Sequence, residues 1–201
     1  MAAIVASVMS FGIADSISTN NLDRKCMTAE QSKQVSTFIK IPTDFPENYS
    51  VKCVAINDPR ELSMIISDKP VTTDEWLHES LNPSGTNIYL HQVDESQYLS
   101  SDKYNDLGSP EQRIRDTIAD IQKQNPKLKP IYYNINGMPA YGIDSCSDCG
   151  IQTADFGDGN VITKTYDVPS KLKIIGDNGV RYSFYGNVSL DDLVKLGNSL
   201  K

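Results

Sequence analysis

Residues 178–200 read NGVRYSFYGNVSLDDLVKLGNSL and contain the strongest signals for the fold. The Asn-Gly pair that opens this stretch is typical of a tight hairpin turn, because both residues tolerate a positive φ. The next residues alternate, so that Val180, Tyr182 and Phe184 share one face of a predicted strand. Ser189 can then cap a helix that buries leucines on one side. The stretch therefore predicts a hairpin strand followed by a helix with one apolar face.

Helix-start and turn signals recur along the rest of the chain. Thr28 and Gln31 form a capping-box pattern at the start of a short helix that is predicted to end near Ser36. Ser109 followed by Pro110 predicts the start of a longer helix with isoleucines on one face. The other predicted elements are a short helix or turn at 73–77 and strands at 51–56, 62–67, 88–93, 131–135, 138–143, 161–166, 172–175 and 180–185.

The order of these elements predicts the fold class. Helix, strands, helix, strands and helix follow one another with hairpin connections and little βαβ character, and no linker or repeat divides them. We therefore expect a single α+β domain over residues 28–201, with one curved antiparallel β-sheet and the helices packed on one face.

The charge balance excludes some classes of partner. The chain has 201 residues, with 19 Lys and Arg against 26 Asp and Glu, and a formal net charge of -7. Binding to nucleic acid or to an anionic membrane depends on clustered Lys and Arg, so we expect neither partner. No stretch reaches the roughly 20 apolar residues that a membrane-spanning helix needs, so we expect no integral membrane span.

The N-terminus has most features of an export signal. Residues 1–14 read MAAIVASVMSFGIA, an uncharged apolar segment that ends in small residues like those before a signal-peptidase site. A complete signal would open with Lys or Arg, whereas the first basic residue is Arg24. Either the true start lies upstream and 1–14 is a partial signal peptide, which is the interpretation we favour, or the segment is not a signal. The alternative is a buried N-terminal helix or strand. Residues 15–27 are polar and aperiodic, which predicts an extended lead-in.

Two further features agree with an extracytoplasmic location, secreted or at the cell surface. Asn48-Tyr49-Ser50 and Asn187-Val188-Ser189 are glycosylation sequons near predicted turns, so Asn48 and Asn187 are candidate acceptors. The four cysteines suit two disulfides in an oxidising compartment.

Two segments resemble a known family. Residues 28–50, TAEQSKQVSTFIKIPTDFPENYS, place a short helix, an apolar pair and two prolines before a strand, and residues 178–200 end in the capped helix described above. Both are similar to an uncharacterised extracytoplasmic domain of bacteria and archaea, itself distantly like the lipoprotein-carrier and anti-sigma-regulator folds. The resemblance implies a curved antiparallel sheet over helices and no known catalytic residues. Residues 72–127 and the pair Cys146 and Cys149 depart from the family pattern.

Cys146-Ser147-Asp148-Cys149 is the most specific local motif. Such a pair can form a disulfide, exchange thiols or supply half of a zinc site. Adjacent carboxylates disfavour a thiolate, so the sequence favours a structural disulfide over a redox centre. Cys26 and Cys53 would then form the second bridge, with a stabilisation of roughly 3 kcal/mol in the loop-entropy model.

A metal centre is the alternative use of the same pair. Cys146 and Cys149 would need two further ligands, and the two histidines, His78 and His91, are the candidates. No second CxxC and no closely spaced histidine pair accompanies them, so we expect no metal and no cofactor.

No enzyme signature is present in the sequence. It has no G-x-S-x-G elbow, no H-E-x-x-H motif, no P-loop and no dinucleotide fingerprint. We therefore expect a secreted, non-enzymatic binding domain whose partner is a protein or a small apolar ligand. The alternative is a thiol-disulfide or metal-binding protein that uses Cys146 and Cys149. The tyrosines of the predicted strands are explained by sheet propensity, although a curved sheet could also form an apolar groove.

Overall fold

The computed structural model describes residues 26–71, 85–96, 108–155, 161–176 and 178–201. In chain order, its elements are α1 (Ala29–Val35), β1 (Ser50–Asp58), β2 (Glu61–Ser67), β3 (Ile88–Asp94), α4 (Pro110–Gln124), β4 (Ile131–Ile135), β5 (Met138–Ile143), β6 (Cys146–Asp155), β7 (Val161–Val168), β8 (Ser170–Ile175), β9 (Val180–Gly186) and α5 (Leu190–Asn198).

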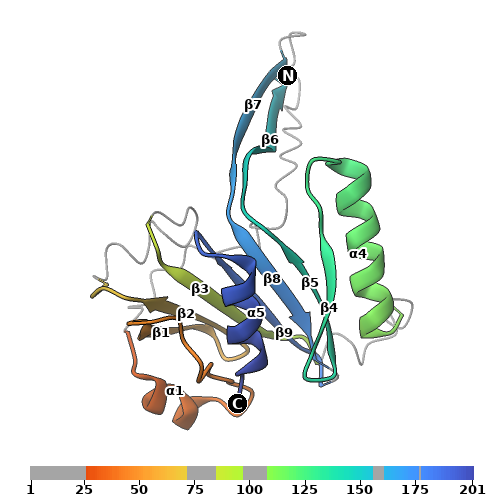
Figure 1. The fold of residues 1–201 in the computed structure, drawn as a ribbon. Helices are drawn as coiled ribbons and strands as arrows, with labels where there is room; N and C mark the ends of the chain where they lie inside the picture. The colour runs from red at the N-terminus through yellow and green to blue at the C-terminus, as the bar shows by residue number, and fades with distance from the viewer. Residues whose placement is uncertain (1–25, 72–84, 97–107, 156–160, 177) are drawn as a thin grey trace, which may run out of the picture.

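Seven strands form one antiparallel sheet in the order β1-β2-β3-β9-β8-β5-β4. The remaining two strands, β6 and β7, pair with each other and project from the sheet as a two-stranded arm (Figure 1). We call this arm, residues 146–155 and 161–168, the β6–β7 ribbon. The predicted α+β class and the antiparallel sheet are confirmed.

The predicted caps and hairpin turns are present. Thr28 forms a complete capping box with Gln31, and the hydroxyls of Ser109 and Ser189 accept backbone N–H groups at the starts of α4 and α5. In the β4–β5 turn, Asn136 and the glycine after it have φ angles of 52° and 87°. Two successive residues with positive φ match the twist of the strands that flank a two-residue hairpin turn.

The first face of the sheet is covered mainly by α5. Leu193 and Leu196 are fully buried and belong to the same core cluster as Leu172 and Ile174 of β8 and Phe184 of β9. The close approach has a backbone cause, because a Cβ placed on Gly197 of α5 would lie 2.9 Å from the Leu172 side chain. This core removes most of the apolar side chains of β8 and β9 from water and is the main source of stability.

A buried glutamine attaches an irregular segment to the same face. Gln92 of β3 is completely buried, and its amide oxygen accepts a hydrogen bond from the Lys40 backbone N–H at 3.0 Å. Its amide nitrogen donates to the Lys40 carbonyl. The adjacent residues Ile39 and Ile41 are buried in the core cluster. Paired hydrogen bonds of this kind satisfy a polar side chain that would otherwise be costly to bury.

The second face of the sheet is covered in part by α4, so the expectation of helices on one face only is not met. Ile114 and Ile121 of α4 pack in a cluster with Tyr141 and Ile143 of β5. Alternate residues of β5 point to opposite faces, and Ala140 belongs instead to the core beneath α5. The reason is that β5 lies inside the sheet and is apolar on both sides, a pattern typical of a strand covered on both faces.

Several predicted segments lie outside the described residues. These are the partial signal peptide at 1–14, the helix or turn at 73–77 and most of the lead-in at 15–27. At the described end of the lead-in, the Met27 backbone pairs with Val54 of β1. Within the described part of the chain, no helix is long and apolar enough to cross a membrane.

Candidate functional site

The β6–β7 ribbon continues two strands of the main sheet. Strand β5 pairs with β8 up to Ile143 and Lys171, and the ribbon pairing begins at Cys146 and Val168. Only two residues separate β5 from β6, and Pro169 alone separates β7 from β8. The ribbon is therefore the outer half of one long hairpin.

Two additional residues interrupt the pairing at the base of the ribbon. Cys146 pairs with Val168 and Gly150 pairs with Tyr166, so four steps along β6 match two steps along β7. The Cys146–Cys149 disulfide closes this bulge, with the two Cα atoms 5.6 Å apart. The predicted disulfide is thus present, and it lies where the strand register changes.

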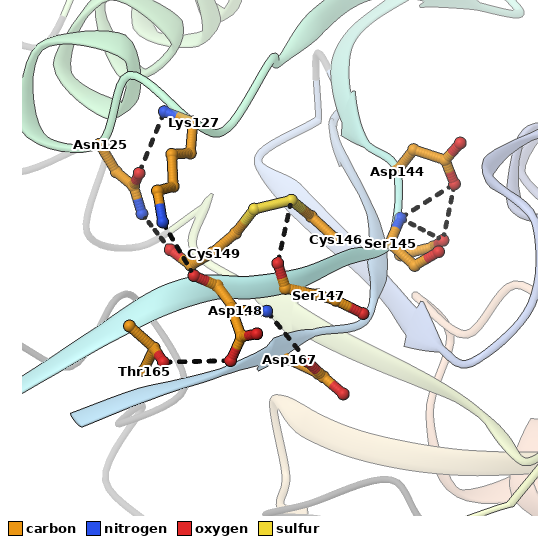
Figure 2. The surroundings of a disulfide bond; sticks show 11 residues. Asn125, Lys127, Asp144, Ser145, Cys146, Ser147, Asp148, Cys149, Thr165 and Asp167 are labelled. Atoms are coloured by element: carbon orange, nitrogen blue, oxygen red, sulfur yellow. Dashed lines mark hydrogen bonds between the residues drawn. A yellow bond between two sulfur atoms is a disulfide. The ribbon is translucent and has the colours of Figure 1, made fainter.

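Side chains of β7 hold the bulge from one side (Figure 2). The Asp148 backbone N–H donates to the Asp167 carboxylate at 3.0 Å, and the Thr165 hydroxyl donates to the Asp148 carboxylate at 3.0 Å. Asp148 has a φ of 55°, a left-handed conformation that Asp tolerates better than most residues. These contacts fix the loop independently of the sulfur atoms.

The residues that follow α4 hold the bulge from the other side. Asn125, which is only 2% exposed, donates from its side-chain amide to the Cys149 carbonyl. Lys127 donates from Nζ to the Asp148 carbonyl at 3.3 Å. The segment that follows α4 therefore contacts the loop from which the ribbon departs.

The last turn before the ribbon is also hydrogen-bonded. The Ser145 backbone N–H donates to the Asp144 carboxylate at 2.9 Å and to the Ser170 hydroxyl at 3.0 Å. The Ser170 hydroxyl in turn donates to the Asp144 carboxylate at 3.1 Å. Ser170 is fully buried, so this small network sets the direction in which the chain leaves the sheet.

The environment of the disulfide favours a structural role over thiol exchange. Cys149 is 4% exposed in the apolar cluster beneath α4, whereas Cys146 is half-buried. A thiolate attacking the more accessible Cys146 would expel Cys149 as a thiolate into apolar surroundings, which is unfavourable. Cys146 also begins a strand, so no helix dipole is available to stabilise its thiolate.

Beyond the base of the ribbon, the side chains that the structure describes are largely exposed. Ile151 is 38% exposed and Tyr166 is 40% exposed. The Tyr166 ring lies over Gly150, since a Cβ on that glycine would be 2.4 Å from a ring carbon. Thr153 and Thr163 face each other with their hydroxyls 3.4 Å apart. The ribbon thus offers apolar and hydroxyl groups to solvent.

The second disulfide joins the N-terminal segment to the sheet. Cys26 and Cys53 are bonded across a sequence separation of 27 residues, and Cys53 of β1 is 1% exposed. This predicted pair is present as well. It lies in a different part of the fold from the ribbon, so the two disulfides stabilise different structures.

The proposed metal ligands do not form a site in the described part of the chain. Cys146 and Cys149 are bonded to each other, and His91 lies on β3 with its Nε2 3.1 Å from the Glu61 carboxylate. His78 is outside the described residues. Where side chains are described, no group of three or more His, Cys, Asp or Glu is arranged to hold a metal ion.

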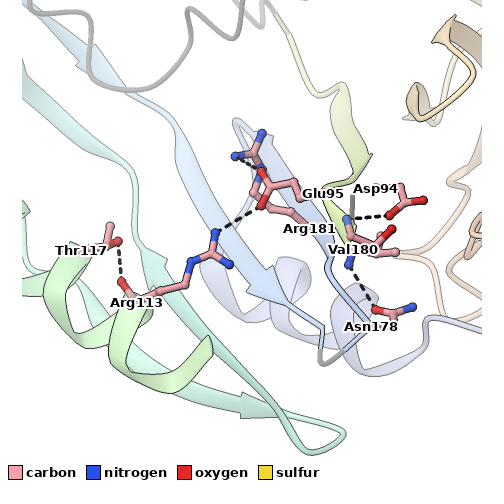
Figure 3. Close-up of polar contacts among 8 residues, drawn as sticks. Asp94, Glu95, Arg113, Thr117, Asn178, Val180 and Arg181 are labelled. Carbon is pink, nitrogen blue, oxygen red and sulfur yellow. Dashed lines mark hydrogen bonds and ion pairs between the residues drawn. The ribbon is translucent and has the colours of Figure 1, made fainter. Parts of the chain in front are cut away.

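An ion cluster that the sequence analysis missed connects α4 to the sheet (Figure 3). Glu95, just after β3, accepts from Arg113 of α4 at 3.2 Å and pairs with Arg181 of β9 at 2.8 Å. The three side chains are only 15 to 18% exposed. The charges are distant in sequence and belong to ordinary polar positions, so no sequence pattern could have identified the cluster.

The strand tyrosines are mostly structural. Burial raises the pKa of Tyr141, Tyr182 and Tyr185 to about 12, so these phenols are neutral near pH 7. The pKa of Tyr133 is raised first by burial and then by the carboxylates of Asp191 and Asp144. Neutral, buried phenols are typical of sheet packing and do not suit acid–base catalysis at neutral pH.

A shallow hollow lies beside α1. Its volume is about 540 Å³, and its lining mixes apolar and charged side chains. The residues that surround it include Met27, Ala29, Glu30, Ile41, Phe45, Val51 and Lys52. A hollow of this size can hold a small ligand with an apolar body.

Comparison with known proteins gives no relative: the chain matches no family model, no curated protein and no solved structure. The resemblance of residues 28–50 and 178–200 to an extracytoplasmic domain therefore stays a prediction.

Proposed function

We propose that the protein is an extracytoplasmic, non-enzymatic binding domain that contacts a partner protein with its β6–β7 ribbon. One observation carries the proposal: the ribbon projects from the sheet, exposes Ile151 and Tyr166, and is fixed at its base by the Cys146–Cys149 loop. The two disulfides and the export-like residues 1–14 support a location outside the cytoplasm.

The ribbon is expected to have low stability on its own, and a binding role would explain why it projects from the sheet. An isolated two-stranded ribbon is marginally stable in water, because neither face is covered by a core. Here the strands continue beyond the last contacts with the sheet, and the side chains at 151–153 and 163–165 are exposed. A partner that covers Ile151 and Tyr166 would supply the missing contacts, and aromatic residues are frequent anchors of protein interfaces.

The fixed base favours binding over a free linker. Asn125 and Asp167 hold opposite sides of the disulfide loop, so the ribbon leaves the sheet in a defined direction. A rigid binding element loses less conformational entropy on association than a mobile one.

Site-specific photo-crosslinking tests the proposal. A photoreactive residue at Ile151 should crosslink a partner protein on cells of the source organism. The same residue at Ile131, a strand position that is 51% exposed on β4, should not. With the captured partner purified, Ile151→Ser/Tyr166→Ser should weaken binding and the exposed-site control Val35→Ser should not. Equal crosslinking at 151 and 131, or unchanged binding of the double variant, would contradict a ribbon interface.

The alternative use of the cysteine pair is tested separately. A thiol-disulfide or metal-binding protein would lose turnover or bound metal in Cys146→Ala/Cys149→Ala. The binding domain should instead keep its partner affinity within a few-fold if the hydrogen bonds of Asp148 still hold the loop. Turnover or stoichiometric metal that depends on these sulfurs would replace the binding proposal.

The hollow beside α1 favours a second candidate function, the binding of a small apolar ligand. Phe45, Val51 and Ile41 provide apolar lining there. Phe45→Asp should abolish the binding of a fluorescent fatty-acid probe if this hollow is used, and Ile151→Ser should leave that binding unchanged. Absence of probe binding to the wild-type protein would remove this candidate.

A further inference from the structure

We propose that Asn48 is a site of N-linked glycosylation in the folded protein and that the second sequon, at Asn187, is not. The proposal depends on the extracytoplasmic location proposed above, because oligosaccharide transfer takes place there. It is independent of what the ribbon binds. Both asparagines are exposed, so the distinction comes from how each sequon is held.

The Asn48 sequon is held through its middle residue and not through its two functional side chains. Tyr49 packs against the main core, and its hydroxyl donates to the Thr86 carbonyl at 2.8 Å. Asn48 lies in a turn with a φ of 67°, closed by a hydrogen bond from the Tyr49 N–H to the Pro46 carbonyl at 3.0 Å. Among the described residues, neither the Asn48 amide nor the Ser50 hydroxyl has a hydrogen-bond partner. Ser50 is the first residue of β1 and pairs with the last residue of β2, Ser67, at the end of the sheet. Strand ends fray readily, so the Asn48 and Ser50 side chains can be presented by a local rearrangement of this end of β1.

The Asn187 sequon is held by both of its functional side chains. The Asn187 amide nitrogen donates to the Gly85 carbonyl at 3.2 Å. The Ser189 hydroxyl accepts from the Asp192 N–H at 3.2 Å and donates to the Asp192 carboxylate at 2.6 Å, as the cap of α5. The residue after it, Leu190, is 5% exposed in the main core. Opening this sequon would uncap α5 and withdraw Leu190 from the core.

Glycosyl transfer requires the asparagine amide and the sequon hydroxyl, and the contacts of these two groups differ between the two sequons. The side-chain nitrogen of the acceptor asparagine forms a bond to C1 of the sugar, the bond from C1 to the lipid pyrophosphate breaks, and the amide loses a proton. The transferase recognises the sequon hydroxyl while the segment is extended. At 48–50 both side chains are free to reach the transferase, whereas at 187–189 both are already engaged in the fold.

The test uses folded, disulfide-bonded protein produced without glycans. It is incubated with a lipid-linked oligosaccharide and a single-subunit oligosaccharyltransferase that accepts Asn-X-Ser/Thr, and its intact mass is measured. We expect one added glycan on the wild-type protein. Asn48→Gln and Ser50→Ala should abolish the mass shift, and Asn187→Gln should retain it.

Two synthetic peptides, residues 44–54 and 183–193, are the matched control for the sequons themselves. Both peptides should be modified, which would show that the fold and not the local sequence selects Asn48. A glycan on Asn187 of the folded protein would overturn the proposal, and so would an unmodified wild-type protein under conditions that modify both peptides. Neither result bears on the crosslinking test of the ribbon, so the two proposals fail separately.

Discussion

Gly150 lies directly across the ribbon from Tyr166, and the tyrosine ring occupies the space that a side chain at residue 150 would need. The pair lies immediately beyond the bulge that the Cys146–Cys149 disulfide closes. An aromatic ring over a cross-strand glycine covers backbone that would otherwise be exposed and helps to fix the register. Because the described side chains at 151–153 and 163–165 are exposed, this pair and the disulfide loop together set how the strands of the ribbon align.

We expect Gly150→Ala to displace the Tyr166 ring and loosen the ribbon. Hydrogen exchange of the amides at 150–154 measures the opening free energy of the ribbon, and the variant should lower it by about 1 kcal/mol. Tyr166→Ala should have a similar effect in the wild type but little further effect in Gly150→Ala. A double-mutant cycle with strictly additive effects would contradict the proposed contact.

The two disulfides should contribute unequally to global stability. Cys26–Cys53 closes a long loop, with a sequence separation of 27, whereas Cys146–Cys149 has a separation of 3. The loop-entropy model gives about 3 to 4 kcal/mol for the first and about 2 kcal/mol for the second. Urea unfolding of Cys26→Ala/Cys53→Ala and Cys146→Ala/Cys149→Ala tests this order. A larger loss for the Cys146 and Cys149 variant would mean that the ribbon base supports the whole sheet.

The sequence predicts those parts of the fold that depend on local chemistry. Thr28, Ser109 and Ser189 begin helices because a hydroxyl in that position satisfies free N–H groups, and this needs no tertiary information. The turn at Asn136 likewise follows from the tolerance of Asn and Gly for positive φ. These elements could be located by their end signals alone.

The parts that the sequence analysis missed depend on distant contacts. Strand β6 contains Gly150 and a bulge, which are signals against a strand, and it is extended because β7 pairs with it. The role of Asn125 at the disulfide loop and that of Gln92 at Lys40 depend on partners 24 and 52 residues away. The periodic pattern of apolar residues in a sequence does not indicate which distant residues pair. The cysteine pairs were predictable because few partners were possible.

Buried tyrosines should make the protein sensitive to alkali. Burial raises the pKa of Tyr141 to about 12, an effect that Arg181 partly opposes, whereas tyrosine in the unfolded chain ionises near pH 10. Its stabilising contribution is therefore complete below pH 10 and is lost as the pH rises toward 12. The wild-type protein should lose free energy of unfolding between pH 8 and pH 11, and in Tyr141→Phe this loss should be smaller by about 1 kcal/mol. Urea titration of both proteins at the two pH values measures the difference. An identical loss in the variant and the wild type would show that Tyr141 is not the group responsible.

The partly buried ion cluster should contribute more to the free energy of unfolding than an exposed ion pair on α4. Glu95 is the carboxylate that contacts both Arg113 and Arg181, and Glu95→Gln would leave two guanidinium groups together without it. We expect a loss of about 2 to 3 kcal/mol in the free energy of unfolding, because uncompensated charge in a partly buried site is costly.

The matched control is Glu111→Gln, which breaks the exposed pair between Glu111 and Arg115 on α4. Those side chains are 55 and 57% exposed, so solvent screens them and the loss should be much smaller than that of Glu95→Gln. Urea unfolding at low and high salt separates the cases, since salt should change the effect of the exposed pair more than that of the cluster. If both variants lost the same small amount, Glu95 would not be what holds α4 against β9. The contacts of Ile114 and Ile121 with Tyr141 would then account for the docking of α4.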